Sequence, residues 1–547
     1  MLNGKSKILG VSVLSAMLFL AGCGEEKKAA AGSDAAKTDA SGKKIVRIGN
    51  GAEPESLDPH KSSDAGSFTI IRQMFLGLTA TDKDGKTIPS LATEWSNVEE
   101  KVWTFKLNPD AKWSNGDPVT AHDFVYGMRR LIDPNTASPY SSYLVDAKVV
   151  GAKEIVAGTA KPDTLGVKAI DDHTLEITLI DPVPYFADLV ALPVTYPVHQ
   201  KTIEAHGDKW LDPANIVVNG AYKLTKHAVN DVIVLDRNEA YFDNANTDID
   251  TIEFLPISGA AQVNRYKADE VDLTSSVPPE QYQKLKAELG DQVQSSPNFC
   301  HYYYGFNTKK APTDDVKVRQ ALSLTIDRDI ITKDIFGRGE LPSYQFTPTA
   351  MQGIDKVMPV WATQDMATRA ATAKQLLNEA GYNESNPLKV EILYSTSETG
   401  KTLTSATAAM WKQHIGFVDT SIINQEWKNM LSIRRQGEYQ ISLGGWCADY
   451  NEPSSFLNVF RSNNENNDGK YNNPQFDKLL DSTIVAGVGA EQRKDLYIQA
   501  ERLLQEDVPA AYLFVSAGTY MIKPHLQADS YKDPLHNWQV KDWKLKK

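Results

Sequence analysis

The alternation of strand-like and helix-like segments between residues 388 and 443 most limits the fold that this chain can adopt. Short apolar runs rich in β-branched residues alternate there with segments whose apolar residues recur at helical spacing. The predicted elements are, in order, a strand at 388–394, a helix at 403–414, a strand at 418–424, a helix at 427–435 and a strand at 439–443. This order builds an α/β sheet, and such sheets bind ligands beyond the carboxyl ends of their strands. The sequence therefore predicts a concave ligand site near the end of the last strand.

The last of these strands leads into a run that combines glycine, cysteine, aromatic and acidic residues. Residues 443–453 read Leu-Gly-Gly-Trp-Cys-Ala-Asp-Tyr-Asn-Glu-Pro. The two glycines allow another backbone to approach closely. Asp449 is a lone carboxylate just beyond the predicted strand. From the residues alone, a turn or helix-capping aspartate is the favoured interpretation of Asp449.

Residues 445–453 resemble the signature of the oligopeptide-binding proteins that feed peptide ABC importers, members of extracellular solute-binding protein family 5. The resemblance covers residues 45–547, and further motifs match in family order at residues 103–107, 112–116, 120–126, 219–224 and 327–331. It implies a type II periplasmic-binding-protein-like fold, with two α/β lobes joined by a hinge and an extra inserted domain. The implied boundaries are 44–75, 198–299 and 516–547 for domain I, 76–197 for domain II, and 300–515 for domain III.

Helical spacing also predicts two helices outside the 388–443 region. Residues 67–78 place Ile70, Ile71, Met74, Phe75 and Leu78 on one helical face. A second helix runs through Val318, Leu322 and Ile326, and Asp314 is its predicted N-terminal cap.

The amino terminus has the pattern of an export signal. Lys5 and Lys7 precede an apolar run at residues 8–20, which is too short to span a bilayer with free flanks. Residues 20–23, Leu-Ala-Gly-Cys, resemble a lipobox, so we expect residues 1–22 to be removed and Cys23 to carry the lipid that anchors the protein to a membrane. The alternative is an ordinary secretory signal with an incidental cysteine. Residues 23–43 contain too little apolar surface to fold and are predicted to form a flexible tether.

Two cysteines remain once Cys23 is set aside. An even number in an exported chain is compatible with a disulfide. The resemblance implies that Cys300 and Cys447 are bonded to each other. Two buried free thiols are the alternative.

Charge and motif content argue against several classes of function. The net charge is −12, and no basic stripe with interleaved aromatic residues indicates nucleic-acid binding. The spacings typical of serine hydrolases, zinc proteases, Cys-x-x-Cys sites and P-loops are absent. Residues 82–85 superficially resemble a calcium loop, but they lack the distal ligands and are predicted to form a hairpin turn. We therefore expect a monomeric binding protein without a metal or cofactor.

A peptide-binding site needs a carboxylate for the ligand's ammonium, an open strand edge for its amides and roomy pockets for its side chains. The resemblance assigns the ammonium to Asp449 and the peptide backbone to Gly445 and Cys447. It also assigns Trp446, Trp427, Tyr140 and Arg434 to the cavity wall. Core packing is the alternative for the aromatic residues.

The sequence departs from the family where other members hold the peptide's carboxyl terminus. Phe336, Gly400 and Leu443 occupy positions at which relatives carry cationic side chains. Arg338, Lys401 and Arg435 are nearby in the chain, but one sequence cannot show whether they substitute. The family residues that bind the peptide's amino end therefore have counterparts in this chain, whereas those that bind its carboxyl end do not.

The resemblance predicts an exported substrate-binding lipoprotein of the periplasm or cell surface, which captures oligopeptides and delivers them to the membrane permease of an ABC importer. Within the binding class, the alternative is a carrier of murein tripeptide in which Arg434 holds a side-branch carboxylate. A secreted peptidase is the alternative from another class.

Overall fold

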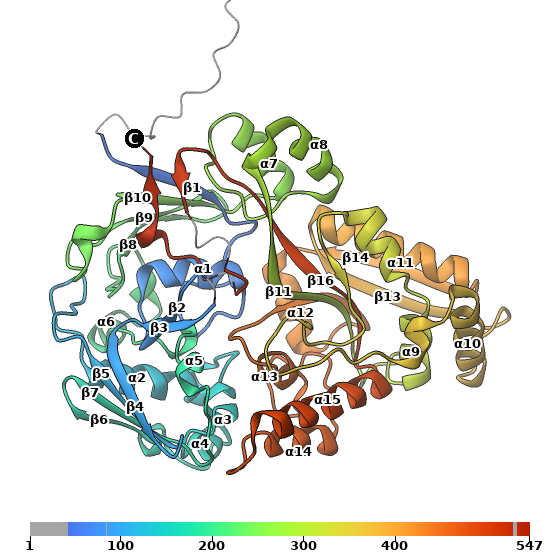
Figure 1. The fold of residues 1–547 in the computed structure, drawn as a ribbon, viewed down its shortest axis with the longest axis horizontal. Coiled ribbons are helices and arrows are strands. Elements are labelled where there is room, and N and C mark those ends of the chain that lie inside the picture. The colour runs from blue at the N-terminus through green and yellow to red at the C-terminus, as the bar shows by residue number, and fades with distance from the viewer. Residues whose placement is uncertain (1–41, 84, 529–532, 536, 547) are drawn as a thin grey trace, which may run out of the picture.

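The computed structural model describes residues 42–83, 85–528, 533–535 and 537–546. The predicted signal peptide, Cys23 and most of the predicted tether lie outside these ranges. The described residues form two lobes of helices and sheets that lie side by side (Figure 1). None of the described helices is both long and apolar enough to span a membrane.

The first lobe, on the left in Figure 1, contains two four-stranded sheets, of order β1-β10-β9-β8 and β4-β5-β7-β6. Their strands are β1 (Ile45–Gly49), β4 (Ala92–Val98), β5 (Val102–Leu107), β6 (Val167–Asp171), β7 (Thr174–Thr178), β8 (Tyr222–Ala228), β9 (Val232–Arg237) and β10 (Thr251–Leu255). Strands β2 (Thr79–Thr81) and β3 (Thr87–Pro89) pair antiparallel, and Asp84 of the predicted turn between them lies outside the described residues. The helices are α1 (Ala65–Met74), α2 (Ala121–Ile132), α3 (Tyr143–Asp146), α4 (Ala152–Val156), α5 (Phe186–Leu189), α6 (Gln200–His206), α7 (Gly259–Lys267) and α8 (Pro279–Leu289).

One hydrophobic core runs through both sheets of the first lobe. Ile48 and Phe254 from the first sheet and Phe105 and Ile177 from the second belong to the same buried cluster. Apolar residues face this core because the strands alternate inward and outward side chains, as in β5, where Trp103, Phe105 and Leu107 are buried. The shared core means that the two sheets form one packed body.

Helix α1 is shorter at its carboxyl end than the apolar spacing predicts. It begins after Asp64, whose side chain accepts a hydrogen bond from the Ser67 amide (2.9 Å), and it ends at Met74. Phe75 adopts an extended backbone. Phe75 and Leu78 are buried as predicted, but they pack from the segment that follows the helix.

Two long antiparallel strands, β11 (Val293–Phe306) and β16 (Ala510–Met521), pass from the first lobe into the second (Figure 1). Val293 pairs with Met521 near the first lobe, and Gly305 pairs with Ala510 inside the second. The register of the pair shifts between residues 297 and 301. An irregularity of this kind bends a strand pair, and here it falls where the chain passes between the lobes.

The second lobe is built on a six-stranded sheet of order β12-β16-β11-β15-β13-β14. Besides β11 and β16 its strands are β12 (Leu341–Pro342), β13 (Leu388–Ser395), β14 (Val418–Gln425) and β15 (Ile441–Cys447). Its helices are α9 (Val316–Leu324), α10 (Met366–Glu379), α11 (Glu398–His414), α12 (Trp427–Gln436), α13 (Ser454–Leu457), α14 (Pro474–Ser482) and α15 (Ala490–Asp507). The predicted order of strands and helices from residue 388 is confirmed, although the last strand begins and ends later than predicted. The predicted cap of α9 is wrong by one residue, because Asp315 rather than Asp314 accepts from the Lys317 amide (2.8 Å).

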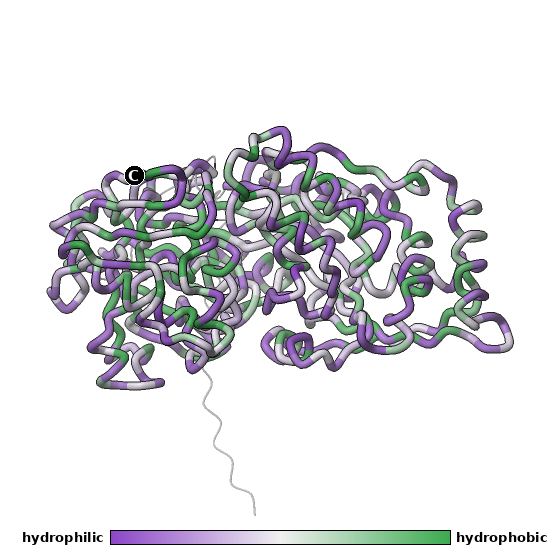
Figure 2. Tube along the Cα trace, turned by 90° about the horizontal axis from the view of Figure 1, so that it is seen from below, coloured by the Kyte–Doolittle hydropathy of each residue, from purple (hydrophilic) through white to green (hydrophobic). Residues whose placement is uncertain are grey.

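The carboxyl-terminal segment returns to the first lobe. Strands β17 (Leu526–Gln527) and β18 (Lys544–Leu545) pair there, and Trp538 and Trp543 are buried in the core of that lobe. The side-chain amide of Gln73 on α1 donates to the Trp538 carbonyl (2.8 Å). Short hydrophobic and hydrophilic stretches alternate along the chain in both lobes (Figure 2), as expected for elements that bury one face.

Candidate ligand-binding site

Strand β15 has an uncovered edge at its carboxyl end. On one side β11 pairs with it from Ile441 to Cys447. On the other side β13 pairs only with Ile441 and Ser442. From residue 443 onward no described strand pairs with this second edge, and Gly445 is exposed to solvent. The edge therefore offers backbone groups to an additional strand.

The hydrogen-bond pattern identifies the residues whose backbone faces the uncovered edge. The Ala448 amide donates to the Phe299 carbonyl of β11 (2.9 Å). Because neighbouring residues of an antiparallel pair alternate in direction, Trp446 also faces β11, whereas Gly445 and Cys447 direct their N–H and C=O groups outward. These are the two residues that the sequence assigned to backbone pairing with a ligand.

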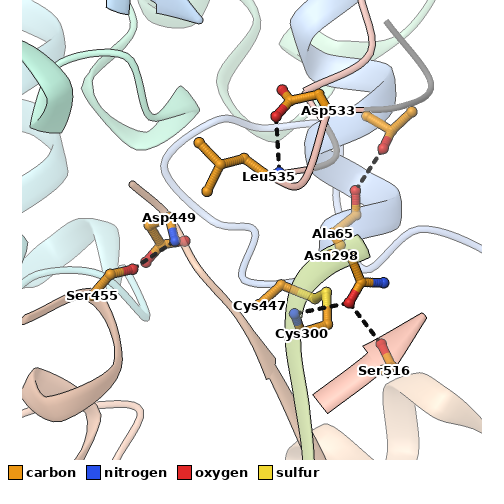
Figure 3. Close-up of a disulfide and its surroundings, with 10 residues drawn as sticks. Ala65, Asn298, Cys300, Cys447, Asp449, Ser455, Ser516, Asp533 and Leu535 are labelled. Carbon is orange, nitrogen blue, oxygen red and sulfur yellow. Dashed lines mark hydrogen bonds between the residues drawn. A yellow bond between two sulfur atoms is a disulfide. The ribbon is translucent and has the colours of Figure 1, made fainter. Parts of the chain in front are cut away.

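Asp449 lies two residues beyond β15, where the two lobes meet. The Tyr140 hydroxyl from the first lobe donates to its carboxylate and is 3.3 Å from each oxygen. The Asp449 amide donates to the Ser455 hydroxyl (2.7 Å), which fixes the backbone of the loop (Figure 3). Asp449 is partly buried, and it lines a small cavity between the lobes.

Burial raises the pKa of Asp449 to about 7, although the charge of Arg72 and the Tyr140 hydrogen bond both act to lower it. Desolvation of a carboxylate is costly unless an opposite charge compensates it. Arg72, on α1, is itself buried, and its positive charge interacts with the carboxylates of Asp449 and Asp533. This compensation is incomplete, because the pKa of Asp449 stays above its usual range.

A cavity of about 30 Å³ adjoins Asp449 between the lobes and is large enough for about two water molecules. Its wall includes Tyr140 and Tyr185 from the first lobe and Trp446, Asp449 and Tyr450 from the second. The rings of Tyr140 and Trp446 stack with centroids 6.5 Å apart. Tyr140 and Trp446 therefore lie beside Asp449, and their role in lining a ligand site stays a prediction.

A disulfide between Cys300 and Cys447 joins β11 to the end of β15 (Figure 3). The two cysteines occupy directly opposite positions in the strand pair. The predicted pairing is confirmed, and the alternative of two free thiols is wrong. The disulfide holds the uncovered edge in place immediately before Asp449.

Trp427 and Arg434, both on α12, contact residues of the second lobe. Trp427 is partly buried and packs against a small cluster of Leu393, Met430 and Tyr439. Arg434 forms an ion pair with Asp468 (Nη2 to Oδ2, 2.9 Å), and the side chains of both residues are 11% exposed. The lining of the cavity beside Asp449 includes neither residue, so their roles toward a ligand stay predictions.

Several contacts close the two lobes on each other around this site. Glu465 of the second lobe accepts from the Ser141 hydroxyl (2.8 Å) and from the Ser142 amide (3.0 Å) of the first. Arg435 of the second lobe pairs with Glu55 of the first (2.6 Å). Both contacts join one lobe directly to the other, so the lobes are closed.

A network of four charges also crosses between the lobes. Asp146 and Lys148 come from the first lobe, and Arg461 and Asp481 come from the second. Arg461 lies 3.6 Å from Asp146 and 3.0 Å from Asp481, while Lys148 lies 2.9 Å from Asp481. Each lobe contributes one positive and one negative charge.

Sequence analysis missed Arg72, Glu465 and the four-charge network. Local sequence carries no signal for them, because their contacts between the lobes join residues that are hundreds of positions apart along the chain. Glu465, for example, is 324 residues from Ser141. Only the placement of the lobes brings them together.

Comparison with known proteins gives consistent matches. The model of the bacterial extracellular solute-binding proteins, family 5, matches residues 86–468. The periplasmic oligopeptide-binding protein OppA of Salmonella typhimurium is 46% identical over 495 residues, which cover 90% of this chain and 91% of that protein. The structure of Haemophilus influenzae OppA in complex with the peptide RPPGFSPFR has a TM-score of 0.90 at 42% identity and covers 92% of this chain and 99% of that one.

Two structures of the murein tripeptide-binding protein MppA allow the position of the lobes to be compared independently of the fold. Both are 38% identical to this chain and cover 92% of it. For the Escherichia coli structure the match covers 99% of that chain with a TM-score of 0.91. For the unliganded open form it covers 97% of that chain with a TM-score of 0.65. At equal identity, this difference reflects the position of the lobes. The arrangement described here is unlike that open form, in agreement with the contacts that close the lobes.

Proposed function

Because the chain belongs to the bacterial extracellular solute-binding proteins of family 5, we propose that it captures oligopeptides between its lobes and delivers them to the permease of an ABC importer. One observation carries this proposal. A buried, incompletely compensated carboxylate stands directly beyond an uncovered strand edge, so an ammonium and an extended backbone can be bound together.

In the proposed complex the peptide's α-ammonium binds Asp449, and its first residues add a strand to β15 through Gly445 and Cys447. Trp446 and Tyr140 flank the first residue of the peptide. The ammonium supplies the positive charge that Arg72 provides only in part. Main-chain hydrogen bonds give affinity without selecting side chains, which suits a carrier of mixed peptides.

We propose that closure is a hinge motion between domain III (300–515) and a body formed by domain I (44–75, 198–299 and 516–547) with domain II (76–197). The register shift in the β11–β16 pair supports a hinge at residues 297–301. The core shared by the two sheets of the first lobe supports movement of domains I and II together.

The relatives reported above are named as periplasmic binding proteins. We propose that this chain is likewise exported and that Cys23 carries a lipid anchor. Mass spectrometry of the amino-terminal peptide tests the anchor, because lipidated Cys23 adds diacylglycerol to that peptide. An unmodified Cys23 in the exported protein would reject it.

The test of the function is to identify what the purified protein carries. Denaturation followed by mass spectrometry is expected to release peptides of mixed sequence, and calorimetry is expected to show binding of a tripeptide pool. Selective binding of murein tripeptide would instead favour the cell-wall carrier, but Arg434, its proposed anchor, is already paired with Asp468. Turnover of a peptide library would favour a peptidase, whereas the matched family and relatives are binding proteins.

A further inference from the structure

We propose that the loop at residues 461–468 of the second lobe, here called the clasp, positions the Tyr140 hydroxyl on the carboxylate of Asp449. The clasp contacts the first lobe immediately before and after Tyr140, and Glu465 is its principal positioning residue. This inference rests on the proposed function and deepens it, because the hydrogen bond that the clasp controls belongs to the carboxylate proposed to bind the ligand's amine.

Glu465 binds the two residues that directly follow Tyr140. One of its carboxylate oxygens accepts from the Ser141 hydroxyl (2.8 Å), and the other accepts from the Ser142 amide (3.0 Å). Ser142 is buried, with 2% of its surface exposed. Because a buried N–H that loses its acceptor is costly, the Glu465 carboxylate stabilises the chain at this point when the lobes are closed.

Asn466 binds the residue that precedes Tyr140. Its side-chain amide donates to the Pro139 carbonyl (3.3 Å). Asn464 extends these contacts into α3, where its side-chain amide donates to the carboxylate of Asp146 (3.3 Å). The clasp therefore follows the first lobe from the residue before Tyr140 to the end of α3.

The second lobe itself holds the clasp in shape. The Asn467 side chain is buried, donates to the carbonyls of Arg461 (3.0 Å) and Tyr471 (2.7 Å) and accepts from the Tyr471 amide (3.0 Å). Asp468 anchors the end of the loop through its ion pair with Arg434 (2.9 Å). These contacts lie within one lobe and do not require closure. The clasp is therefore preorganised to receive the first lobe.

The hydrogen bond between Tyr140 and Asp449 is sensitive to small displacements. The hydroxyl is 3.3 Å from each carboxylate oxygen, which is longer than the usual O–H···O distance. Asn464 and Asn466 line the same cavity as Tyr140 and Asp449, so the clasp borders the site directly. A small retreat of the first lobe from the clasp would break this bond.

The pKa of Asp449 reports whether the hydroxyl is in place. Burial raises this pKa to about 7, while the charge of Arg72 and the Tyr140 hydrogen bond lower it. Withdrawal of the hydroxyl should therefore raise the pKa further. Removal of the negative charge of Glu465 would by itself act in the opposite direction, because a nearby like charge raises the pKa of a carboxyl. An upward shift in Glu465→Ala therefore identifies loss of the hydrogen bond.

The test uses calorimetry on the mature protein with the tripeptide Ala-Phe-Ala and compares the wild type, Glu465→Ala, Tyr140→Phe and the double variant. Each single substitution is expected to weaken binding about 5- to 100-fold. The double variant should bind at least about threefold better than the product of the two losses, because both substitutions remove the same hydrogen bond. Between pH 8 and pH 5, the affinity of Glu465→Ala should begin to decline at a higher pH than that of the wild type.

Two further variants serve as controls. Glu465→Gln keeps an acceptor oxygen for the Ser142 amide and should recover part of the affinity. Asn463 is exposed in the same loop, and no hydrogen bond among the described residues joins it to the first lobe. Asn463→Ala should therefore match the wild type in affinity and in pH dependence. Thermal melting without ligand checks the fold of every variant.

Losses that multiply in the double variant, or a decline of Glu465→Ala that begins at the wild-type pH, would overturn the inference and leave Glu465 as a contact that only closes the lobes. Failure of the proposed function gives a different result. In that case the wild type itself does not bind the tripeptide, and the inference fails with it.

Discussion

The Tyr140 hydroxyl lies 3.3 Å from both carboxylate oxygens of Asp449, although the two residues belong to different lobes and are 309 positions apart in the sequence. Because this hydrogen bond joins the two lobes, the proposed binding of an amine at Asp449 would be coupled to closure of the lobes.

Affinity for free-amine peptides should depend on pH through Asp449. Burial raises its pKa to about 7, so below pH 7 the ligand-free carboxyl binds a proton that the ammonium must displace. Affinity is therefore complete above pH 7 and falls as the pH drops toward 5, by as much as tenfold per unit. Calorimetry from pH 8 to pH 5 measures this loss, and the N-acetyl peptide serves as the control. An equal pH dependence for the acetylated ligand would assign the effect to another group.

Removal of the outward amide of Gly445 should weaken binding. Proline at this position lacks the N–H that faces the uncovered edge, whereas the bonds to β11 come from its neighbours. Gly445→Pro is expected to reduce peptide affinity by about 2- to 12-fold, the value of one hydrogen bond. In Gly445→Ala, the added Cβ meets no atom closer than 3.6 Å, so affinity should be retained. Equal losses in both variants would mean that space, rather than the amide, matters here.

The four-charge network should contribute to closure and hence to affinity. Arg461→Met leaves Asp146 with an 8% exposed side chain and no arginine in the closed form, so affinity should fall by about 10- to 100-fold. Lys148→Met is the matched control, because its partner Asp481 is 55% exposed and the pair should contribute less than about fivefold. Calorimetry gives the affinities, and thermal melting without ligand checks the fold. Equal effects of the two substitutions would show that burial of Asp146 is not what matters.

The Cys300–Cys447 disulfide should stabilise the protein. Its sequence separation is 147. In the chain-entropy model, a disulfide that closes such a loop raises the free energy of unfolding by about 4–5 kcal/mol. Neither cysteine should react with an alkylating reagent before reduction, and reduction should lower the melting temperature. Alkylation of both cysteines in the native, unreduced protein would contradict the bond.

Local pattern was enough to predict the elements that carry the site. The order β13, α11, β14, α12 and β15 follows from apolar spacing, and Asp449 follows the last strand as expected. The end of α1 was predicted wrongly because Phe75 and Leu78 continue the apolar spacing while packing from an extended segment. Burial depends on tertiary contacts that periodicity does not contain.

The charge partners could not be predicted because they depend on the placement of distant segments. Arg434 was assigned to the cavity wall from the resemblance, and only the fold brings Asp468 within 2.9 Å of it. The role of Arg435 was open in the sequence, and in the structure it pairs with Glu55, which is 380 positions away. For the same reason, sequence alone left the carboxyl end of the ligand site open.

The central claim is that Asp449 binds the α-ammonium of the ligand, and a double-mutant cycle tests it most directly. Calorimetry compares the wild type and Asp449→Asn with a free-amine peptide and with its N-acetyl form. Breaking a buried charge pair costs about 3–5 kcal/mol, so either change alone should weaken binding by roughly two to four orders of magnitude. Both changes together should cost much less than the sum, because they remove the same interaction. Additive losses would contradict the claim and would mean that the amine is held elsewhere, with Glu452 the next residue to test.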